Sequence, residues 1–97
     1  MTPDFGPIAA AIAARTGIPF SPRSIRPVAG GSIHRAWRVD DGERRYFVKT
    51  GDTAAAAMFA AEASGLRALA EAAVVPAPTF VAMGDVAALS FLVLEHL

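Results

Sequence analysis

Three features of the chain have the residue types of a phosphate-binding site. The stretch Gly30-Gly31-Ser32 lies between two strand-like runs, Lys49 ends a third such run, and Glu62 lies in a long helical segment. Glycines let the backbone come close to phosphate oxygens, and their N–H groups can donate hydrogen bonds to them. A lysine ammonium offsets phosphate charge, and a carboxylate on a neighbouring helix can hold that ammonium in place. This order predicts a nucleotide site, but a glycine pair between strands also suits a plain turn.

The helical period places Glu62 among apolar side chains. At about 100° per residue, Glu62 lies roughly 60° and Leu66 roughly 20° from Phe59 around the helix axis. A charged carboxylate in such a stripe is costly unless it is paired. Lys49 shares a strand face with Phe47 and is the other charge in an apolar setting. A Lys49–Glu62 ion pair satisfies both groups; in the alternative, each side chain reaches water separately, Glu62 from the edge of the stripe and Lys49 from the strand end.

The elements that position these residues follow from periodicity and turn residues. A helix is expected over Pro7–Thr16, with Asp4 as its cap and Gly17 as its stop. A second, long helix is expected over Thr53–Ala73, with Thr53 as its cap and Gly65 packed closely against the sheet. Asp40–Gly42 predicts a hairpin turn. Strands are expected over Ile25–Ala29, Ile33–Asp40, Arg44–Lys49, Thr79–Met83 (stopped by Gly84-Asp85) and Leu89–Leu94, the last buried on both faces.

The pattern of elements predicts an α+β fold. It comprises a five-stranded, mostly antiparallel sheet, one long helix after the third strand, and a short N-terminal helix. With 97 residues, the chain is expected to form a single domain over residues 1–97.

Composition and charge exclude several classes of function. The formal net charge of +0 does not suit a nucleic-acid partner, and the absence of cysteine excludes disulfides and cysteine metal sites. Asp4 precedes Arg15 around the first apolar run, which is the wrong charge order for a secretory signal. We therefore expect a cytoplasmic protein with no membrane partner. His34 and His96 are too far apart in the sequence to suggest a metal site.

Five stretches in order carry a resemblance to a known family: GGSIHRAW, YFVK, FAAEASGLRALA, VPAPTFVAMG and FLVLEHL. Together they resemble the N-terminal lobe of the fructosamine kinase (ketosamine-3-kinase) family, from about Ile25 to Leu97. That family is a branch of the protein-kinase-like fold, related to aminoglycoside and choline kinases. The resemblance implies ATP and Mg²⁺ as cofactors. It also implies phosphorylation of the sugar 3-hydroxyl of ketosamines, including those on glycated protein lysines.

The resemblance also implies a role for individual residues. Gly30, Gly31 and Ser32 correspond to the glycine-rich loop over the ATP phosphates. Lys49 corresponds to the third-strand lysine that contacts the α- and β-phosphates, and Glu62 to the helix glutamate that pairs with it. Leu94–Leu97 corresponds to the hinge, where the main-chain groups of Glu95, His96 and Leu97 would hydrogen-bond adenine. The apolar wall of the adenine pocket would be formed by Val28, Val48 and Leu92.

The family's catalytic and metal-binding residues lie in a C-terminal lobe, with an H-G-D-type motif that has no counterpart here. The chain is therefore expected to be a piece of a longer enzyme that stops at the hinge, without catalytic residues or metal ligands. Alone, it is expected to be inactive and to self-associate through an uncovered cleft face. Two other interpretations remain open: the lobe of an aminoglycoside, choline or homoserine kinase, and a non-enzymatic α+β module in which Lys49 and Glu62 are merely structural.

Overall fold

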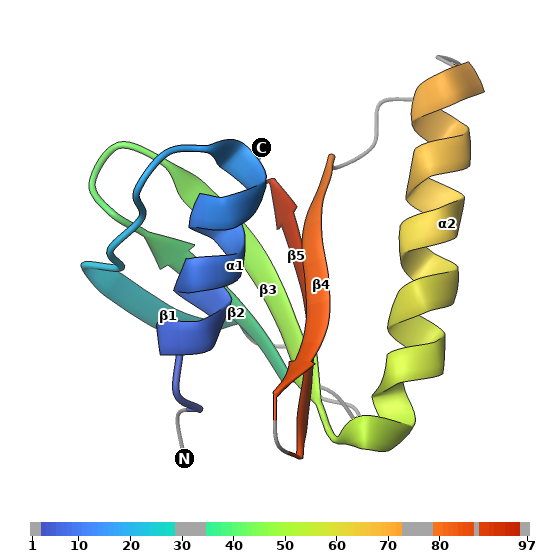
Figure 1. The fold of residues 1–97 in the computed structure, drawn as a ribbon, viewed down its shortest axis with the longest axis horizontal. Coiled ribbons are helices and arrows are strands. Elements are labelled where there is room, and N and C mark those ends of the chain that lie inside the picture. The colour runs from blue at the N-terminus through green and yellow to red at the C-terminus, as the bar shows by residue number, and fades with distance from the viewer. Residues whose placement is uncertain (1–2, 29–34, 73–78, 87, 96–97) are drawn as a thin grey trace.

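The computed structural model describes residues 3–28, 35–72, 79–86 and 88–95, and Figure 1 shows their arrangement. The elements in chain order are α1 (Gly6–Thr16), β1 (Ser24–Val28), β2 (Arg35–Asp40), β3 (Arg45–Gly51), the 3-10 turn η1 (Thr53–Ala55), α2 (Ala56–Ala72), β4 (Phe80–Val86) and β5 (Leu89–Glu95). The strands form one sheet in the order β1-β2-β3-β5-β4, and every neighbouring pair is antiparallel. The predicted α+β fold class is confirmed.

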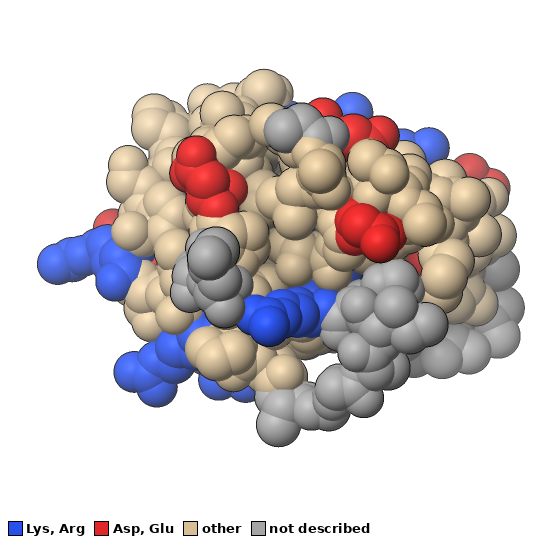
Figure 2. All heavy atoms as spheres, turned by 90° about the horizontal axis from the view of Figure 1, so that it is seen from below, with Lys and Arg blue, Asp and Glu red and all other residues tan. Residues whose placement is uncertain are grey.

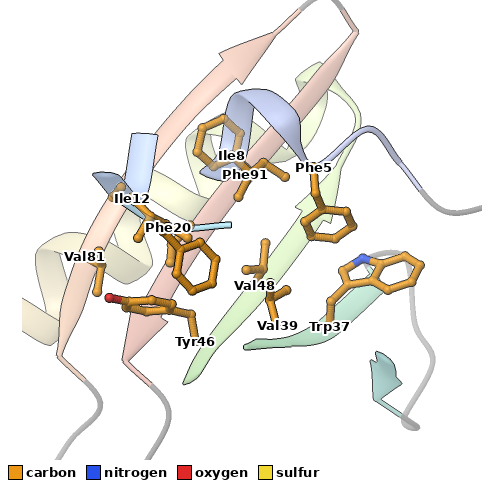
Figure 3. Close-up of a cluster of buried hydrophobic side chains, with 12 residues drawn as sticks. Phe5, Ile8, Ile12, Phe20, Trp37, Val39, Tyr46, Val48, Val81 and Phe91 are labelled. Carbon is orange, nitrogen blue, oxygen red and sulfur yellow. The ribbon is translucent and has the colours of Figure 1, made fainter. Parts of the chain in front are cut away.

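Two helices cover opposite faces of the sheet, so the fold has two hydrophobic cores. In the larger core, Ile8 and Ile12 of α1 pack against strand residues that include Trp37, Tyr46 and Val48 (Figure 3). In the smaller core, α2 packs through Phe59 and Ala63 against Leu92 and Leu94 of β5. The near-continuous apolar run of β5 serves both cores, as the sequence predicts, because its alternate side chains point to opposite faces.

The helix starts differ from those expected. Phe5 occupies the N-cap position of α1 without a side-chain cap, and Asp4 instead accepts a hydrogen bond from the Gly6 N–H at 2.9 Å. Before α2, Asp52 is the cap, and its Oδ1 accepts from the Ala54 N–H at 3.0 Å. The prediction of Thr53 as the cap was wrong, because the carboxylate one residue earlier already satisfies the amide. The stop of α1 at Gly17 is confirmed by its left-handed φ of 76°.

Two glycines have roles other than those expected. β4 does not stop at Gly84 but continues to Val86, and Gly84 pairs with Phe91 of β5. An added Cβ at Gly84 would lie 3.1 Å from a ring carbon of Phe91, so the glycine permits close approach of the two strands. Gly65 is the opposite case: an added Cβ would meet nothing within 4 Å, so the expected close packing against the sheet was wrong.

The remaining strand boundaries shift by one or two residues. The β2–β3 loop spans Asp41 to Arg44, and Gly42 there has a φ of 98°, so a hairpin at Asp-Gly is confirmed. Asp41 Oδ1 accepts from the backbone N–H groups of Arg44 at 2.7 Å and Glu43 at 2.9 Å. β3 runs on to Gly51, two residues beyond the predicted end. The expected strand residues Ala29, Ile33 and His34 lie outside the described residues.

Candidate nucleotide-binding site

Lys49 and Glu62 form the ion pair that the sequence predicts. Lys49 Nζ, on β3, lies 3.0 Å from Oε1 and 2.8 Å from Oε2 of Glu62, on α2. The alternative, in which each side chain reaches water separately, is therefore wrong. Strand alternation turns Lys49 toward the α2 side of the sheet, and the helical period turns Glu62 toward β3.

The pair is half-buried, with 32% of the Lys49 side chain and 35% of the Glu62 side chain exposed. Water screens an ion pair at this depth, so we expect it to stabilise the fold by less than about 1 kcal/mol. Its main effect is to position the Lys49 ammonium. Two of the three ammonium donors point to the Glu62 oxygens, which leaves one donor for a further acceptor.

The sheet register shows which side chains share the face of Lys49. Val28, Ala36, Lys49 and Leu92 are paired across β1, β2, β3 and β5 in one row, and directly paired residues point to the same face. Val28 and Ala36 are half-buried, whereas Leu92 is fully buried beneath α2. Val28 and Leu92 therefore lie on the face of Lys49, but α2 covers Leu92 completely, so Leu92 has no exposed surface with which to line a pocket.

Val48 is not on this face, and its expected place in the adenine pocket was wrong. Its side chain is fully buried in the α1 core (Figure 3), and strand alternation turns Lys49 to the opposite side of β3. Phe47 is the β3 residue that shares the face of Lys49; it is half-buried and is paired with Arg38 and Leu94. The sequence already indicates that Phe47 shares the face of Lys49, because residues two apart on a strand share a face.

Basic residues surround the apolar part of this face. Arg26 and Arg38 are both exposed and directly opposed across β1 and β2, two residues along the strands from Val28 and Ala36. Figure 2, seen from below relative to Figure 1, shows basic side chains projecting at the left, on the β1–β2 side of the molecule. Such clustered positive charge attracts anions and raises their local concentration.

Several predicted site residues cannot be placed. Gly30, Gly31 and Ser32 fall in the segment 29–34, and His96 and Leu97 follow β5; all lie outside the described residues. Of the expected hinge, Leu94 is buried in the α2 core and Glu95 is exposed. The Glu95 N–H donates to the Thr79 carbonyl at 2.8 Å, so this amide is already used within the fold.

The described residues contain neither a cluster of metal ligands nor a membrane-spanning helix. Within them, no three His, Cys, Asp or Glu side chains come together in a way that could hold a metal ion. No helix in this described part is long and apolar enough to cross a membrane.

Comparison with known proteins gives consistent results. The fructosamine kinase family model matches residues 5–97. A probable ketoamine kinase of Synechocystis is 41% identical over 93% of this chain, and one of Klebsiella aerogenes is 40% identical over 70%. The chain spans only about 30% and 24% of these two proteins.

Solved structures agree with the fold. A crystal structure assigned as a fructosamine-3-kinase from Haemophilus somnus matches with a TM-score of 0.87 and 28% identity, over 93% of this chain and 30% of that one. An aminoglycoside phosphotransferase, solved with AMP-PNP and hygromycin B, matches with a TM-score of 0.62 and 21% identity, over 94% of this chain and 29% of that one. This second likeness shows the fold alone. The family match covers nearly the whole chain, and the chain therefore belongs to the fructosamine kinase family.

Proposed function

We propose that this chain is the ATP-binding lobe of a longer enzyme that transfers the γ-phosphoryl group of ATP to a ketosamine hydroxyl. The observation that carries the proposal is the Lys49–Glu62 pair, which holds a half-exposed ammonium on an open, basic sheet face. Membership of the fructosamine kinase family and the ketoamine kinase relatives support the reaction class. The remainder of the enzyme would supply the substrate contacts.

The residues of this lobe would bind and orient the nucleotide. Lys49 would donate its free N–H to a phosphate oxygen while Glu62 fixes the direction of the ammonium. The apolar surface of Val28, Ala36 and Phe47 is suited to a planar base, and backbone N–H groups of residues 30–32 would receive the phosphates.

Phosphoryl transfer also needs groups that the described residues do not offer. A base must accept the proton of the sugar hydroxyl as its oxygen bonds to phosphorus and the bond to ADP breaks. Mg²⁺, when bound to ATP, neutralises charge on the phosphates. Since the chain spans only about 30% of its ketoamine kinase relative, we propose that the metal ligands and the base belong to the rest of the enzyme.

Substitution of Lys49 tests the proposal in the full-length enzyme that carries this chain. We expect Lys49→Ala to lower kcat/KM for ATP-dependent phosphorylation of fructosyl-lysine by about 100-fold or more, because it removes a preorganised phosphate donor. Glu62→Gln should have a smaller effect, since the ammonium remains but loses its charged anchor. Glu71→Gln, at an exposed position of the same helix, is the control and should keep full activity. Full activity of Lys49→Ala in a folded protein would refute the role of Lys49.

Two neighbouring residues of β3 test which face binds the base. Phe47→Leu should raise KM for ATP severalfold, because it removes the aromatic surface from the face of Lys49 while keeping most of the volume. Val48→Ala should lower the melting temperature and leave KM unchanged, because Val48 lies in the α1 core. The reverse result, with KM sensitive only to Val48, would contradict the assignment of the nucleotide to this face.

A further inference from the structure

A second basic site lies away from Lys49, between α1, β4 and α2. It is a pocket of about 460 Å³ lined by Ala11, Ala14 and Arg15 of α1, Arg67 of α2, and Phe80–Met83 of β4. A register shift between Phe80 and Ala82 shapes its floor, because Phe80 then packs with the α2 core while Val81 and Ala82 pack with the α1 core. Figure 1 shows α1 and α2 on opposite sides of β4, and the lining residues place the pocket along this strand.

The charge of this pocket is unbalanced. Its lining contains two arginines, six apolar residues and no acid. Within the described residues, neither Arg15 nor Arg67 forms an ion pair, and Cζ of Arg67 lies 4.7 Å from the centroid of the Phe80 ring. Both arginines are exposed, so the positive charge at this pocket has no acidic partner and is open to an anion from solution.

We propose that this pocket binds a small organic anion with one carboxylate or phosphate group and an apolar body. The anionic group would bridge Arg15 and Arg67, each of which offers paired N–H donors that match carboxylate and phosphate oxygens. The apolar body would lie on Phe80 and Met83, and Met83 is 43% exposed and open to such a contact. The site is separate from the proposed nucleotide site and goes beyond the proposed kinase function.

Occupation of the pocket would tie α1 to α2. The contacts of α2 with the sheet come mainly from its first half, through Phe59 and Ala63, while Leu69 in its second half is 41% exposed. Arg67 lies in this loosely held half, one and a half turns after Glu62. An anion held there would restrain α2 and therefore the position of Glu62 beside Lys49.

Phenyl phosphate is a suitable probe, and its binding to the folded protein can be measured by calorimetry or NMR titration. We expect saturable binding, with Arg15→Gln and Arg67→Gln each weakening the affinity by roughly tenfold, a change of about 1.4 kcal/mol. Arg23→Gln, an exposed arginine outside the pocket and outside the face of Lys49, is the matched control and should bind as the parent protein does. Inorganic phosphate should bind more weakly, because it has no apolar body to cover Phe80 and Met83.

A Lys49→Ala variant distinguishes this site from the proposed nucleotide site. It should bind phenyl phosphate with unchanged affinity, whether or not the proposed kinase function holds. The proposal is overturned if binding does not saturate, if Arg23→Gln weakens it as much as Arg67→Gln does, or if Lys49→Ala abolishes it.

Discussion

Gly65 and Gly84 allow a direct test of the packing, because adding one methyl group should have opposite effects at the two positions. At Gly65, inside α2, a Cβ would meet nothing within 4 Å. Gly65→Ala should therefore stabilise the protein by about 0.8–1.0 kcal/mol, the difference in helix propensity. For a domain of this size, that change raises the melting temperature by about 4–8 °C.

At Gly84, a Cβ would lie 3.1 and 3.3 Å from two ring carbons of Phe91. Phe91 is only 3% exposed and is packed in the α1 core, so its ring has little room to move. Overpacking of this kind costs about 1–3 kcal/mol, which exceeds the gain of about 0.4–1 kcal/mol from a stiffer unfolded chain. We therefore expect Gly84→Ala to destabilise the protein by about 1–2 kcal/mol, whereas Gly65→Ala should stabilise it.

Thermal and urea unfolding, followed by circular dichroism, measure both effects. Adding Phe91→Leu to Gly84→Ala should recover part of the loss, because leucine lacks the ring carbons that the methyl group would strike. The reasoning fails if Gly65→Ala destabilises the protein, since something must then pack against that position. It fails equally if Gly84→Ala is neutral in the presence of Phe91.

Two further predictions concern polar groups in the fold. Hydrogen bonds from the backbone N–H groups of Arg44 and Glu43 lower the pKa of Asp41 from its ordinary value of 3.8. The ionised Asp41 carboxylate therefore stabilises the fold fully above pH 3.8, and this contribution is lost as the pH falls through the lowered pKa. The parent protein should melt at a higher temperature than Asp41→Asn near neutral pH, and this difference in melting temperature should shrink below about pH 4. Trp37 Nε1 donates to Thr50 Oγ1 at 2.9 Å, and both side chains are buried. Thr50→Val should cost about 1–3 kcal/mol in urea unfolding, and the cost should fall when Trp37→Phe removes the donor; an equal cost in both backgrounds would contradict the pairing.

The periods of strand and helix predicted which way the Lys49 and Glu62 side chains point. A strand period of two turns Lys49 toward α2, and a helix period of 3.6 turns Glu62 toward β3, so the two side chains meet between β3 and α2. The family resemblance implied Val48 as part of the pocket wall, but strand alternation puts its side chain on the face opposite Lys49. The same period that predicts the ion pair would have selected Phe47.

Glycines and caps were harder to predict, because one residue type serves several physical purposes. Gly84 permits close approach to Phe91, Gly42 adopts a positive φ in a loop, and Gly65 does neither within the described residues. The local Asp-Gly sequence identified the turn at Gly42, but nothing local separated Gly65 from Gly84, which differ only in the atoms that an added Cβ would meet. Asp52 and Thr53 are likewise both good cap residues, and their order along the backbone decides which one reaches the free amide.

The buried face of β3 determines where the functional face points. Val48 is fully buried and its neighbour Lys49 is half-exposed, so the two faces of one strand lie in very different environments. A slip of β3 by one residue would bury the Lys49 ammonium in the α1 core and expose Val48, at the cost of a desolvated charge and lost apolar burial. The packing of Tyr46 and Val48 against α1 therefore fixes the register that brings Lys49 to Glu62. Because the ion pair itself adds little stability, this core sets where the backbone of Lys49 lies, and Glu62 then orients the ammonium at the end of the side chain.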